Sequence, residues 1–215
     1  IFQKIDFQLR ISKSSSSKRY SELIFKFNEL LAMNRFDGVV VFGDVNTTVA
    51  AALAASREGY PIHHVESGLR SFDVNMPEEV NRIIVDNLSE TLFTTEKSAC
   101  QNLIEEGFPK HKIHLVGNLM IETLIRKSPH IDKIEITHKD YFLTTIHRAE
   151  NIYDPHRLKK IFELLKYIGK SRKIVMPLHP ATRIALQSSG LNFSDIPNLV
   201  VEKPLPYFQF IKCMK

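Results

Sequence analysis

The chain has 215 residues, of which 43% are hydrophobic and 25% are charged. This length and composition suit one full domain, or one domain and part of another, with a sizeable soluble core. The formal net charge of +5 comes from mixed charges rather than from a basic, aromatic-interleaved face, which argues against a nucleic-acid-binding module. A mild positive balance instead suits an anionic small ligand.

The two cysteines, Cys100 and Cys213, lie far apart and lack the spacing of a disulfide framework or a metal site. We therefore expect a reducing, cytoplasmic compartment and no bound metal.

No apolar run is long enough to span a bilayer, and no signal peptide is visible. The chain begins with Ile1 rather than Met and stops inside an expected helix, so it looks cut at both ends. Its one dense basic segment, residues 13–19, is interpreted as a solvated, mobile loop.

Strands and helices alternate along the chain, which predicts an α/β fold with a doubly wound, mostly parallel sheet. In chain order the expected elements are a helix over 21–34, a strand over 38–43, a helix over 46–58, a strand over 61–65, a helix beginning at 77, a strand over 91–95, a helix over 96–106, a strand over 112–116, a helix over 118–127, a strand over 141–146, a helix over 154–168, a strand over 173–178, a short helix near 181–187, a strand near 199–202 and a helix from 206. The polar stretch 128–139 contains Pro129 and is the expected domain junction.

Local signals refine two of these helices. Ser21 is a plausible cap for the first helix, because serine is a favoured residue at that position. Pro77 suits the first turn of the third helix, where its missing N–H costs nothing. The spacing of apolar residues along that helix predicts a buried face made of Val80, Ile83, Ile84 and Leu88.

Polar side chains follow several of the expected strands. Asp44 follows the first strand, Glu66 the second, and Glu78 lies in the first turn of the helix after the Glu66 loop. His147 and His179 follow two later strands. Open α/β sheets bind ligands at the carboxyl ends of their strands, so these side chains are the candidates for a site. If two domains face each other, the carboxylates come from the first and the histidines from the second.

Each candidate also has a structural explanation. Asp44 is equally well explained as the cap of the following helix. Glu78 and Glu79 could both complement a helix dipole, which is the better explanation for Glu79, and His179 could be an ordinary histidine at a strand end. Arg70 and Arg82 could be surface ion-pair partners. It is improbable that packing alone places so many polar side chains at one edge of the sheet, so the joint pattern favours a functional site.

Other catalytic signatures are absent from the sequence. It has no GxGxxG, no P-loop lysine motif, no GxSxG elbow, and no CxxC or HExxH pair that suggests a metal. The missing Gly-rich phosphate cradle weighs against a nicotinamide-dependent redox enzyme. His63 and His64 lie in one strand and point to opposite faces, so at most one of them can face a site.

Seven sequence blocks, in a specific order, cover nearly the whole chain: GDVNTT (43–48), HVESGLRSFD (64–73), MPEEVNRIIVDNLS (76–89), LFTTEKSACQNLIEEG (92–107), KIHLVGNLMIETL (112–124), TTIHRAEN (144–151) and PLHP (177–180). With these blocks the chain resembles the non-hydrolysing UDP-N-acetylglucosamine 2-epimerases. The resemblance implies a GT-B-like architecture of two Rossmann-like domains with UDP in the cleft between them. The expected N-terminal domain covers 1–128 without its first strand, the junction 129–139, and an incomplete UDP-binding domain 140–215.

The resemblance also implies the chemistry. Family members interconvert UDP-N-acetylglucosamine and UDP-N-acetylmannosamine without a metal or other cofactor: the C2 proton is removed, UDP leaves to give a 2-acetamidoglucal, and UDP adds back. Asp44, Glu66 and Glu78 match the acid/base carboxylates, and His147 matches the histidine on the UDP side. The further substrate contacts that we expect are Arg70, Arg82, Arg148, Glu150 and His179. A homodimer is expected for the full-length protein.

Departures from the family pattern keep alternatives open. Ala149 stands where the family often has arginine, so one phosphate contact is in doubt. The family's opening strand should precede Ile1 and its UDP-gripping segment should follow Lys215, so the piece alone is expected to be inactive. The alternatives are an epimerase acting on a UDP-diacetamido sugar, a hydrolysing relative that releases N-acetylmannosamine, and a non-catalytic sugar-nucleotide-binding fragment. A GT-B glycosyltransferase would share the fold without needing three carboxylates.

Overall fold

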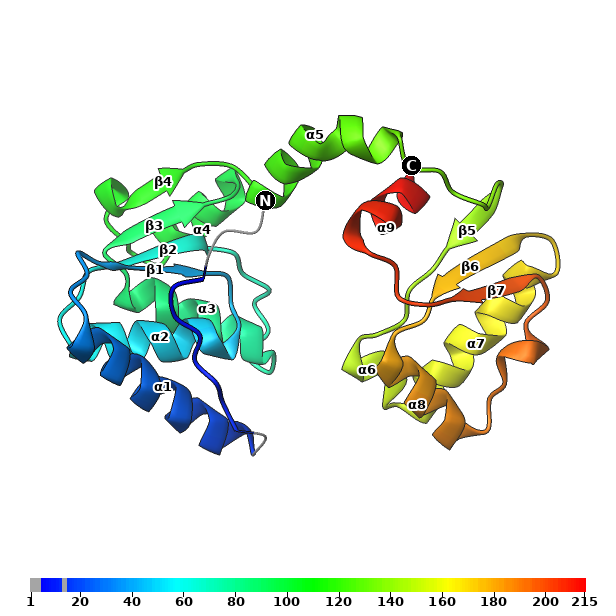
Figure 1. Ribbon diagram of the computed structural model, residues 1–215, viewed down its shortest axis with the longest axis horizontal. Helices are drawn as coiled ribbons and strands as arrows, with labels where there is room; N and C mark the ends of the chain where they lie inside the picture. The colour runs from blue at the N-terminus through cyan, green and yellow to red at the C-terminus, as the bar shows by residue number, and fades with distance from the viewer. Residues whose placement is uncertain (1–4, 13–14) are drawn as a thin grey trace. The chain divides into compact units, whose positions relative to one another are not determined.

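The computed structural model describes residues 5–12 and 15–215. Its contacts divide the chain into two compact units, Ile1–Glu122 (unit 1) and Thr123–Lys215 (unit 2). Each unit contains its own parallel sheet, with strand order β1-β2-β3-β4 in unit 1 and β5-β6-β7 in unit 2 (Figure 1). Parallel strands joined through helices confirm the predicted α/β class with Rossmann-like sheets.

Most elements lie close to where the sequence predicts them. In unit 1 they are α1 (Ser16–Met33), β1 (Val39–Phe42), α2 (Asn46–Arg57), β2 (Ile62–Ser67), α3 (Pro77–Leu88), β3 (Thr91–Thr94), α4 (Lys97–Glu105), η1 (Lys110–Lys112) and β4 (Ile113–Leu115). Helix α5 (Leu119–Asp132) begins in unit 1 and ends in unit 2. Unit 2 continues with β5 (Tyr141–Leu143), α6 (Ala149–Ile152), α7 (Pro155–Gly169), β6 (Lys173–Pro177), α8 (Pro180–Ser189), η2 (Phe193–Asp195), β7 (Leu199–Glu202) and α9 (Tyr207–Met214).

The basic segment near the N-terminus is not a loop along its whole length. Lys13 and Ser14 lie outside the described residues, but α1 begins at Ser16, so the prediction of a mobile loop is wrong from there on. Ser21 is not a cap either, because it lies inside α1 and its hydroxyl donates to the Lys18 carbonyl oxygen at 3.0 Å. The apolar face of the helix extends back to Tyr20, which packs against the core and favours the earlier start.

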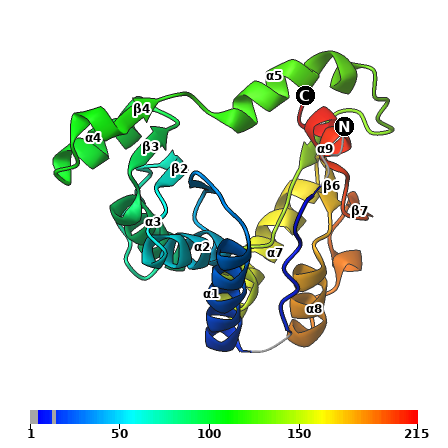
Figure 2. The ribbon, with the colours of Figure 1, turned by 60° about the vertical axis from the view of Figure 1, so that its left-hand side comes forward.

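The core of unit 1 forms where the Ala-rich helix α2 packs between α1 and α3, as Figures 1 and 2 show. Small side chains on α2 let both neighbouring helices and the sheet approach closely. The buried members of this cluster are Leu31, Val39, Val41, Val49, Ala52, Ala55, Ile62 and Val85. This packing fixes the carboxyl ends of β1 and β2 against the first turns of α2 and α3.

Helix α3 buries only part of the predicted face: Ile84 and Leu88 pack against the core as predicted, but the other two residues do not. Val80 and Ile83 are 40% and 36% exposed, whereas Glu79 and Asp86 are among its buried residues. The apolar spacing misled the prediction because the polar residues find hydrogen-bond partners in the loops that follow the strands. Their burial directs charged groups toward the sheet edge where a ligand is expected.

Helix α5 runs through Pro129 to Asp132, so the first residues of the predicted junction 129–139 are helical. The contact division falls earlier, after Glu122, and the domain limits 1–128 and 140–215 stay a prediction. Within the described residues no helix has both the length and the apolar character needed to cross a membrane.

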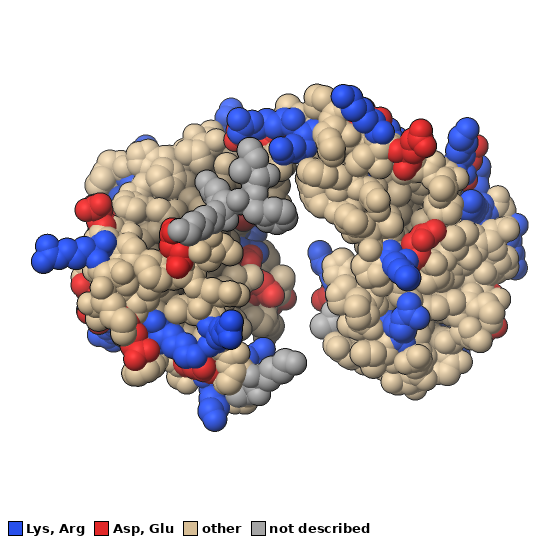
Figure 3. Space-filling model, in the orientation of Figure 1, with Lys and Arg blue, Asp and Glu red and all other residues tan. Residues whose placement is uncertain are grey.

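Unit 2 has a core of its own. Its buried cluster joins α6, α7, β6 and α8, with Phe162 and Ile174 near its centre. Gly169 permits a close approach, because a Cβ there would lie 2.1 Å from the Pro197 carbonyl oxygen. On the face shown in Figure 3, basic and acidic residues are interspersed over both units, in keeping with the mixed charge of the sequence.

Candidate active site

The ends of β1 and β2 lie side by side in unit 1. Phe42, the last residue of β1, pairs with Val65 of β2, and the Gly43 N–H donates to the Val65 carbonyl oxygen at 3.0 Å. Asp44 and Glu66 follow these residues directly, so they emerge at the same edge of the sheet. The register of the sheet thus brings together two of the three predicted carboxylates.

Asp44 is held by α3 rather than serving as a cap. Its Oδ2 accepts from Arg82 Nη2 at 2.6 Å, and its carbonyl oxygen accepts from Asn81 Nδ2 at 2.7 Å. Helix α2 has Val45 at its N-cap position and no side-chain cap, so the cap explanation of Asp44 is wrong. The Asp44 side chain remains 28% exposed and can be reached from solvent.

Glu66 has an unusual backbone for a non-glycine residue, with φ at 73°. It lies where the pairing of β2 with β3 is irregular, between Val65 and Ser67. Such a conformation costs about 1–3 kcal/mol and persists where surrounding structure enforces it, often at functional sites. The Glu66 side chain lies beside the turn that leaves β1, with its Oε2 3.5 Å from where a Gly43 Cβ would be.

Glu79 is an internal anchor for the loop after Arg70. The side chain is 1% exposed and accepts from the N–H groups of Ser71 and Phe72 at 2.9 and 3.1 Å. It also accepts from Arg82 Nη1 at 2.9 Å, so Arg82 bridges Glu79 and Asp44. The prediction that Glu79 merely complements the helix dipole is wrong, because its carboxylate is buried by specific hydrogen bonds.

These contacts make the stability of unit 1 depend on pH. Burial alone would raise the pKa of the Glu79 carboxyl, but the hydrogen bonds from Ser71, Phe72 and Arg82 outweigh it and lower that pKa. A folded-state pKa below the unfolded value gives stability that is present above the unfolded pKa and lost as pH falls through the folded pKa. Glu79→Gln should therefore destabilise unit 1 near neutral pH by about 1–3 kcal/mol.

The same difference should shrink as the pH falls below the ordinary glutamate pKa of about 4.3 and then through the lower folded-state pKa of Glu79. Urea denaturation of both proteins at neutral and acidic pH measures it. A constant difference between the two proteins over that range would show that the Glu79 charge does not stabilise the fold.

The remaining predicted residues of unit 1 behave differently from one another. Glu78 is exposed in the first turn of α3, one residue before the buried Glu79.

The Arg70 side chain is 1% exposed, so the surface ion-pair explanation is wrong for it. Its guanidinium makes two hydrogen bonds with Glu106, at 2.6 and 2.7 Å, and one ion pair with Asp86 at 2.8 Å. Arg70 therefore holds the fold in this structure, and its expected role as a substrate contact gains no support.

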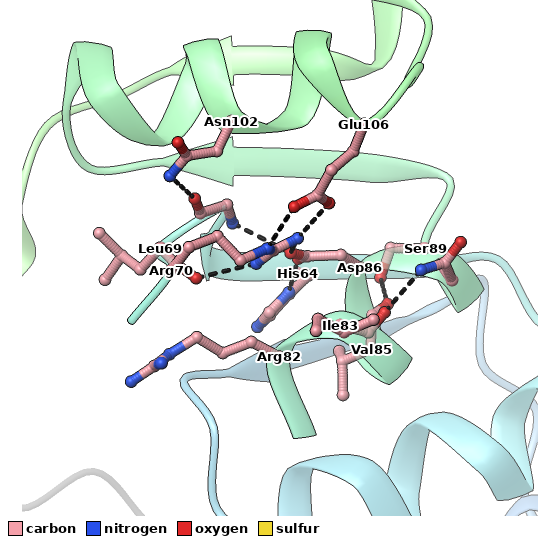
Figure 4. A network of polar contacts seen from close by, with 12 residues as sticks. His64, Leu69, Arg70, Arg82, Ile83, Val85, Asp86, Ser89, Asn102 and Glu106 are labelled. Carbon is pink, nitrogen blue, oxygen red and sulfur yellow. Dashed lines mark hydrogen bonds and ion pairs between the residues drawn. The ribbon is translucent and has the colours of Figure 1, made fainter. Parts of the chain in front are cut away.

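Burial alone would lower the pKa of Arg70, but the contacts with Glu106 and Asp86 outweigh it and raise that pKa. Figure 4 shows the Arg70 guanidinium between these two carboxylates. The arginine is thus fixed as a cation inside unit 1.

Sequence reasoning missed the centre of this network, Asp86, which is fully buried beside His64. His64 Nδ1 lies 2.6 Å from Asp86 Oδ1 and His64 Nε2 lies 2.9 Å from the Gly43 carbonyl oxygen. Because the Gly43 carbonyl oxygen can only accept, Nε2 donates to it. His64 is thus the inward member of the histidine pair. Asp86 lies in the block 76–89 and in a helix that looks amphipathic, so no local signal sets it apart as a buried charge.

Unit 2 brings its two predicted histidines together. The rings of His147 and His179 have centroids 5.9 Å apart, and His179 caps α8 by accepting from the Ala181 N–H at 3.2 Å. The loop before His147 is fixed by Thr182, whose hydroxyl donates to the Ile146 carbonyl oxygen. His147 itself is exposed.

Arg148 and Glu150 lie on the surface of unit 2 next to His147 in the sequence. Their side chains are 76% and 59% exposed and 3.8 Å apart, which makes a weak, solvent-screened ion pair. Both remain available to a ligand. Across residues 5–12 and 15–215, no group of three or more His, Cys, Asp or Glu residues is placed to hold a metal ion.

Both units contain parallel Rossmann-like sheets, with acidic groups at the strand ends of one unit and histidines at those of the other. These features define an α/β protein with units of the GT-B kind. The family model described as UDP-N-acetylglucosamine 2-epimerase matches residues 1–215. The chain therefore belongs to the UDP-N-acetylglucosamine 2-epimerase family, as the sequence blocks predict.

Individual relatives agree with this assignment. The chain is 37% identical to the UDP-N-acetylglucosamine 2-epimerase of Methanococcus maripaludis, over 97% of this chain and 61% of the relative. It is 38% identical to the UDP-2,3-diacetamido-2,3-dideoxy-D-glucuronate 2-epimerase of Pseudomonas aeruginosa, over 97% of this chain and 59% of that protein. The crystal structure of the Methanocaldococcus jannaschii UDP-GlcNAc 2-epimerase in complex with UDP-GlcNAc and UDP matches with a TM-score of 0.89 and 33% identity, covering 98% of this chain and 61% of that one. The chain thus spans about three fifths of the length of these relatives.

Proposed function

We propose that the full-length protein interconverts UDP-N-acetylglucosamine and UDP-N-acetylmannosamine by eliminating UDP and adding it back. The observation that carries the proposal is the TM-score of 0.89 with a 2-epimerase crystallised with UDP-GlcNAc and UDP. The family match over residues 1–215 supports it further.

In the proposed reaction a carboxylate takes the proton from C2 of the sugar. The electron pair of that C–H bond forms the C1=C2 double bond, and the C1–O bond breaks as UDP leaves with its electron pair. Asp44 is held by Arg82 at 2.6 Å, whereas none of the hydrogen bonds or ion pairs among the described residues engages the Glu66 carboxylate. We assign the C2 proton transfer to Glu66 on that ground, with Asp44 and Glu78 as the other acid/base groups.

His147 is assigned to the leaving UDP, whose negative charge a protonated imidazole stabilises. The other proposed substrate contacts in unit 2 are His179, Arg148 and Glu150, which lie close to it in the fold or the sequence. Arg82 is the proposed cation of unit 1, since it already holds Asp44.

A second candidate substrate is a UDP-2,3-diacetamido uronic acid, because the Pseudomonas aeruginosa relative is named for that sugar. NMR of sugar products separates the candidates when the full-length protein is incubated with each UDP-sugar. We expect UDP-N-acetylmannosamine to form from UDP-N-acetylglucosamine. Release of free N-acetylmannosamine would establish a hydrolysing enzyme, and turnover of the diacetamido sugar alone would establish the second candidate.

We further propose a cytoplasmic homodimer that needs neither cofactor nor nucleic acid. The mixed charge on the face in Figure 3 weighs against nucleic-acid binding, and the two free cysteines suit a reducing compartment. The homodimer follows from the family resemblance alone. Sedimentation of the full-length protein tests its oligomeric state. Calorimetry with UDP on the present chain tests whether these residues alone retain binding.

A further inference from the structure

The buried carboxylate of Asp86 connects the two strand ends that carry the acidic residues of unit 1. Its Oδ2 accepts from the Gly68 N–H at 3.1 Å, two residues after Glu66. Its Oδ1 lies 2.6 Å from Nδ1 of His64, two residues before Glu66. His64 Nε2 in turn lies 2.9 Å from the carbonyl oxygen of Gly43, at the end of β1. One carboxylate therefore fixes the backbone on both sides of Glu66 and in the turn that leads out of β1.

Glu66 needs this support because its backbone lies in the left-handed region, with φ at 73°. The neighbouring strand does not enforce this conformation, since the pairing with β3 is irregular between Val65 and Ser67. A non-glycine residue keeps such a backbone when its surroundings determine it from several sides. Asp86 supplies two of the contacts that determine it, beside the Asn102 Nδ2 that donates to the Gly68 carbonyl oxygen at 2.9 Å.

We propose that Asp86 is a positioning residue for the reaction. It orients Glu66 through His64 and Gly68, and it orients the turn before Asp44 through His64. The proposal rests on the proposed function of these two carboxylates. Asp86 is 0% exposed, so it acts through its neighbours and not by touching the substrate.

The network offers a matched control at Glu106. This residue binds the opposite side of Arg70 at 2.6 and 2.7 Å, and among its described contacts none reaches the residues that flank Glu66. Asp86→Asn is the conservative variant. Its amide oxygen can accept from Gly68, and its amide NH₂ can donate to His64 Nδ1 while Nε2 still donates to Gly43.

Steady-state kinetics of the full-length protein tests the positioning role. Asp86→Ala should lower kcat by about 100-fold and change KM by less than about 3-fold, because a displaced base loses the reacting geometry while the substrate contacts remain. Asp86→Asn and Glu106→Gln should keep kcat within about 5-fold of the wild type. A normal kcat in folded Asp86→Ala, or an equal loss in Glu106→Gln, overturns the proposal.

Amide hydrogen exchange separates this proposal from the proposed function, because it needs no turnover. Asp86→Ala should speed exchange at residues 43–46 and 64–68 by at least about 10-fold, and Glu106→Gln should not. This contrast would support the positioning role even if the wild type epimerised no UDP-sugar. Where Asp86→Ala does not fold, His64→Leu replaces it, and unchanged exchange at residues 43–46 overturns the proposal.

Discussion

Asp86→Ala is expected to destabilise unit 1 by about 3–5 kcal/mol, the range for removing one partner from a buried ionic network. The change leaves the inward-facing ring of His64 without its carboxylate partner and removes one of the two anions that neutralise Arg70. It also leaves the buried Gly68 N–H without an acceptor. Native-state hydrogen exchange of the amides in β2 and β3 measures the opening free energy of this unit.

Two comparisons sharpen the result. Asp86→Asn should cost less than about 2 kcal/mol, because an amide can retain the hydrogen bonds while losing the charge. Amides of β6 in unit 2 should exchange as in the wild type, because that unit has a separate buried cluster. A loss below about 1 kcal/mol in the alanine variant would mean that the network is not stabilising as a whole.

Glu66→Gln is expected to lower the turnover of the full-length protein by at least about 100-fold, the scale for losing a positioned acid or base. Glutamine keeps the size of the side chain and its place beside Gly43, so the fold should be little affected. Asp44→Asn and Glu78→Gln should each produce a loss of similar size. NMR of the sugar products gives the rates, and circular dichroism reports whether each variant is folded.

Glu58→Gln is the matched control, because Glu58 is an exposed carboxylate at the other end of α2. It should leave turnover and stability unchanged. Near-normal rates in all three site variants, with intact folding, would show that the roles assigned to these carboxylates are wrong.

Sequence periodicity was sufficient to predict the parallel α/β class and the order of the elements, because buried strands and amphipathic helices leave local signatures. It placed Asp44 and Glu66 at strand ends, and sheet register brings those ends together. The positive φ of Glu66 could not be foreseen, because it lies at an irregularity in the pairing of β2 with β3 and beside tertiary contacts that no local pattern indicates.

Helix α3 shows why the buried polar residues could not be predicted from the sequence alone. An apolar stripe through Val80 and Ile83 looks like a core face, yet these side chains are partly exposed. Glu79 and Asp86 are buried instead, since the loop between β2 and α3 folds back and supplies hydrogen-bond partners for both. Such hydrogen-bond partnerships depend on tertiary structure, and a local pattern of hydrophobicity does not predict them.

The separate cores of the two units have a thermodynamic consequence. Each unit has its own sheet and its own buried apolar cluster, so cooperativity is expected within each unit rather than across the whole chain. A single melting temperature would then average two distinct transitions. Calorimetric enthalpies from this polypeptide are therefore properly analysed as the sum of two unfolding reactions.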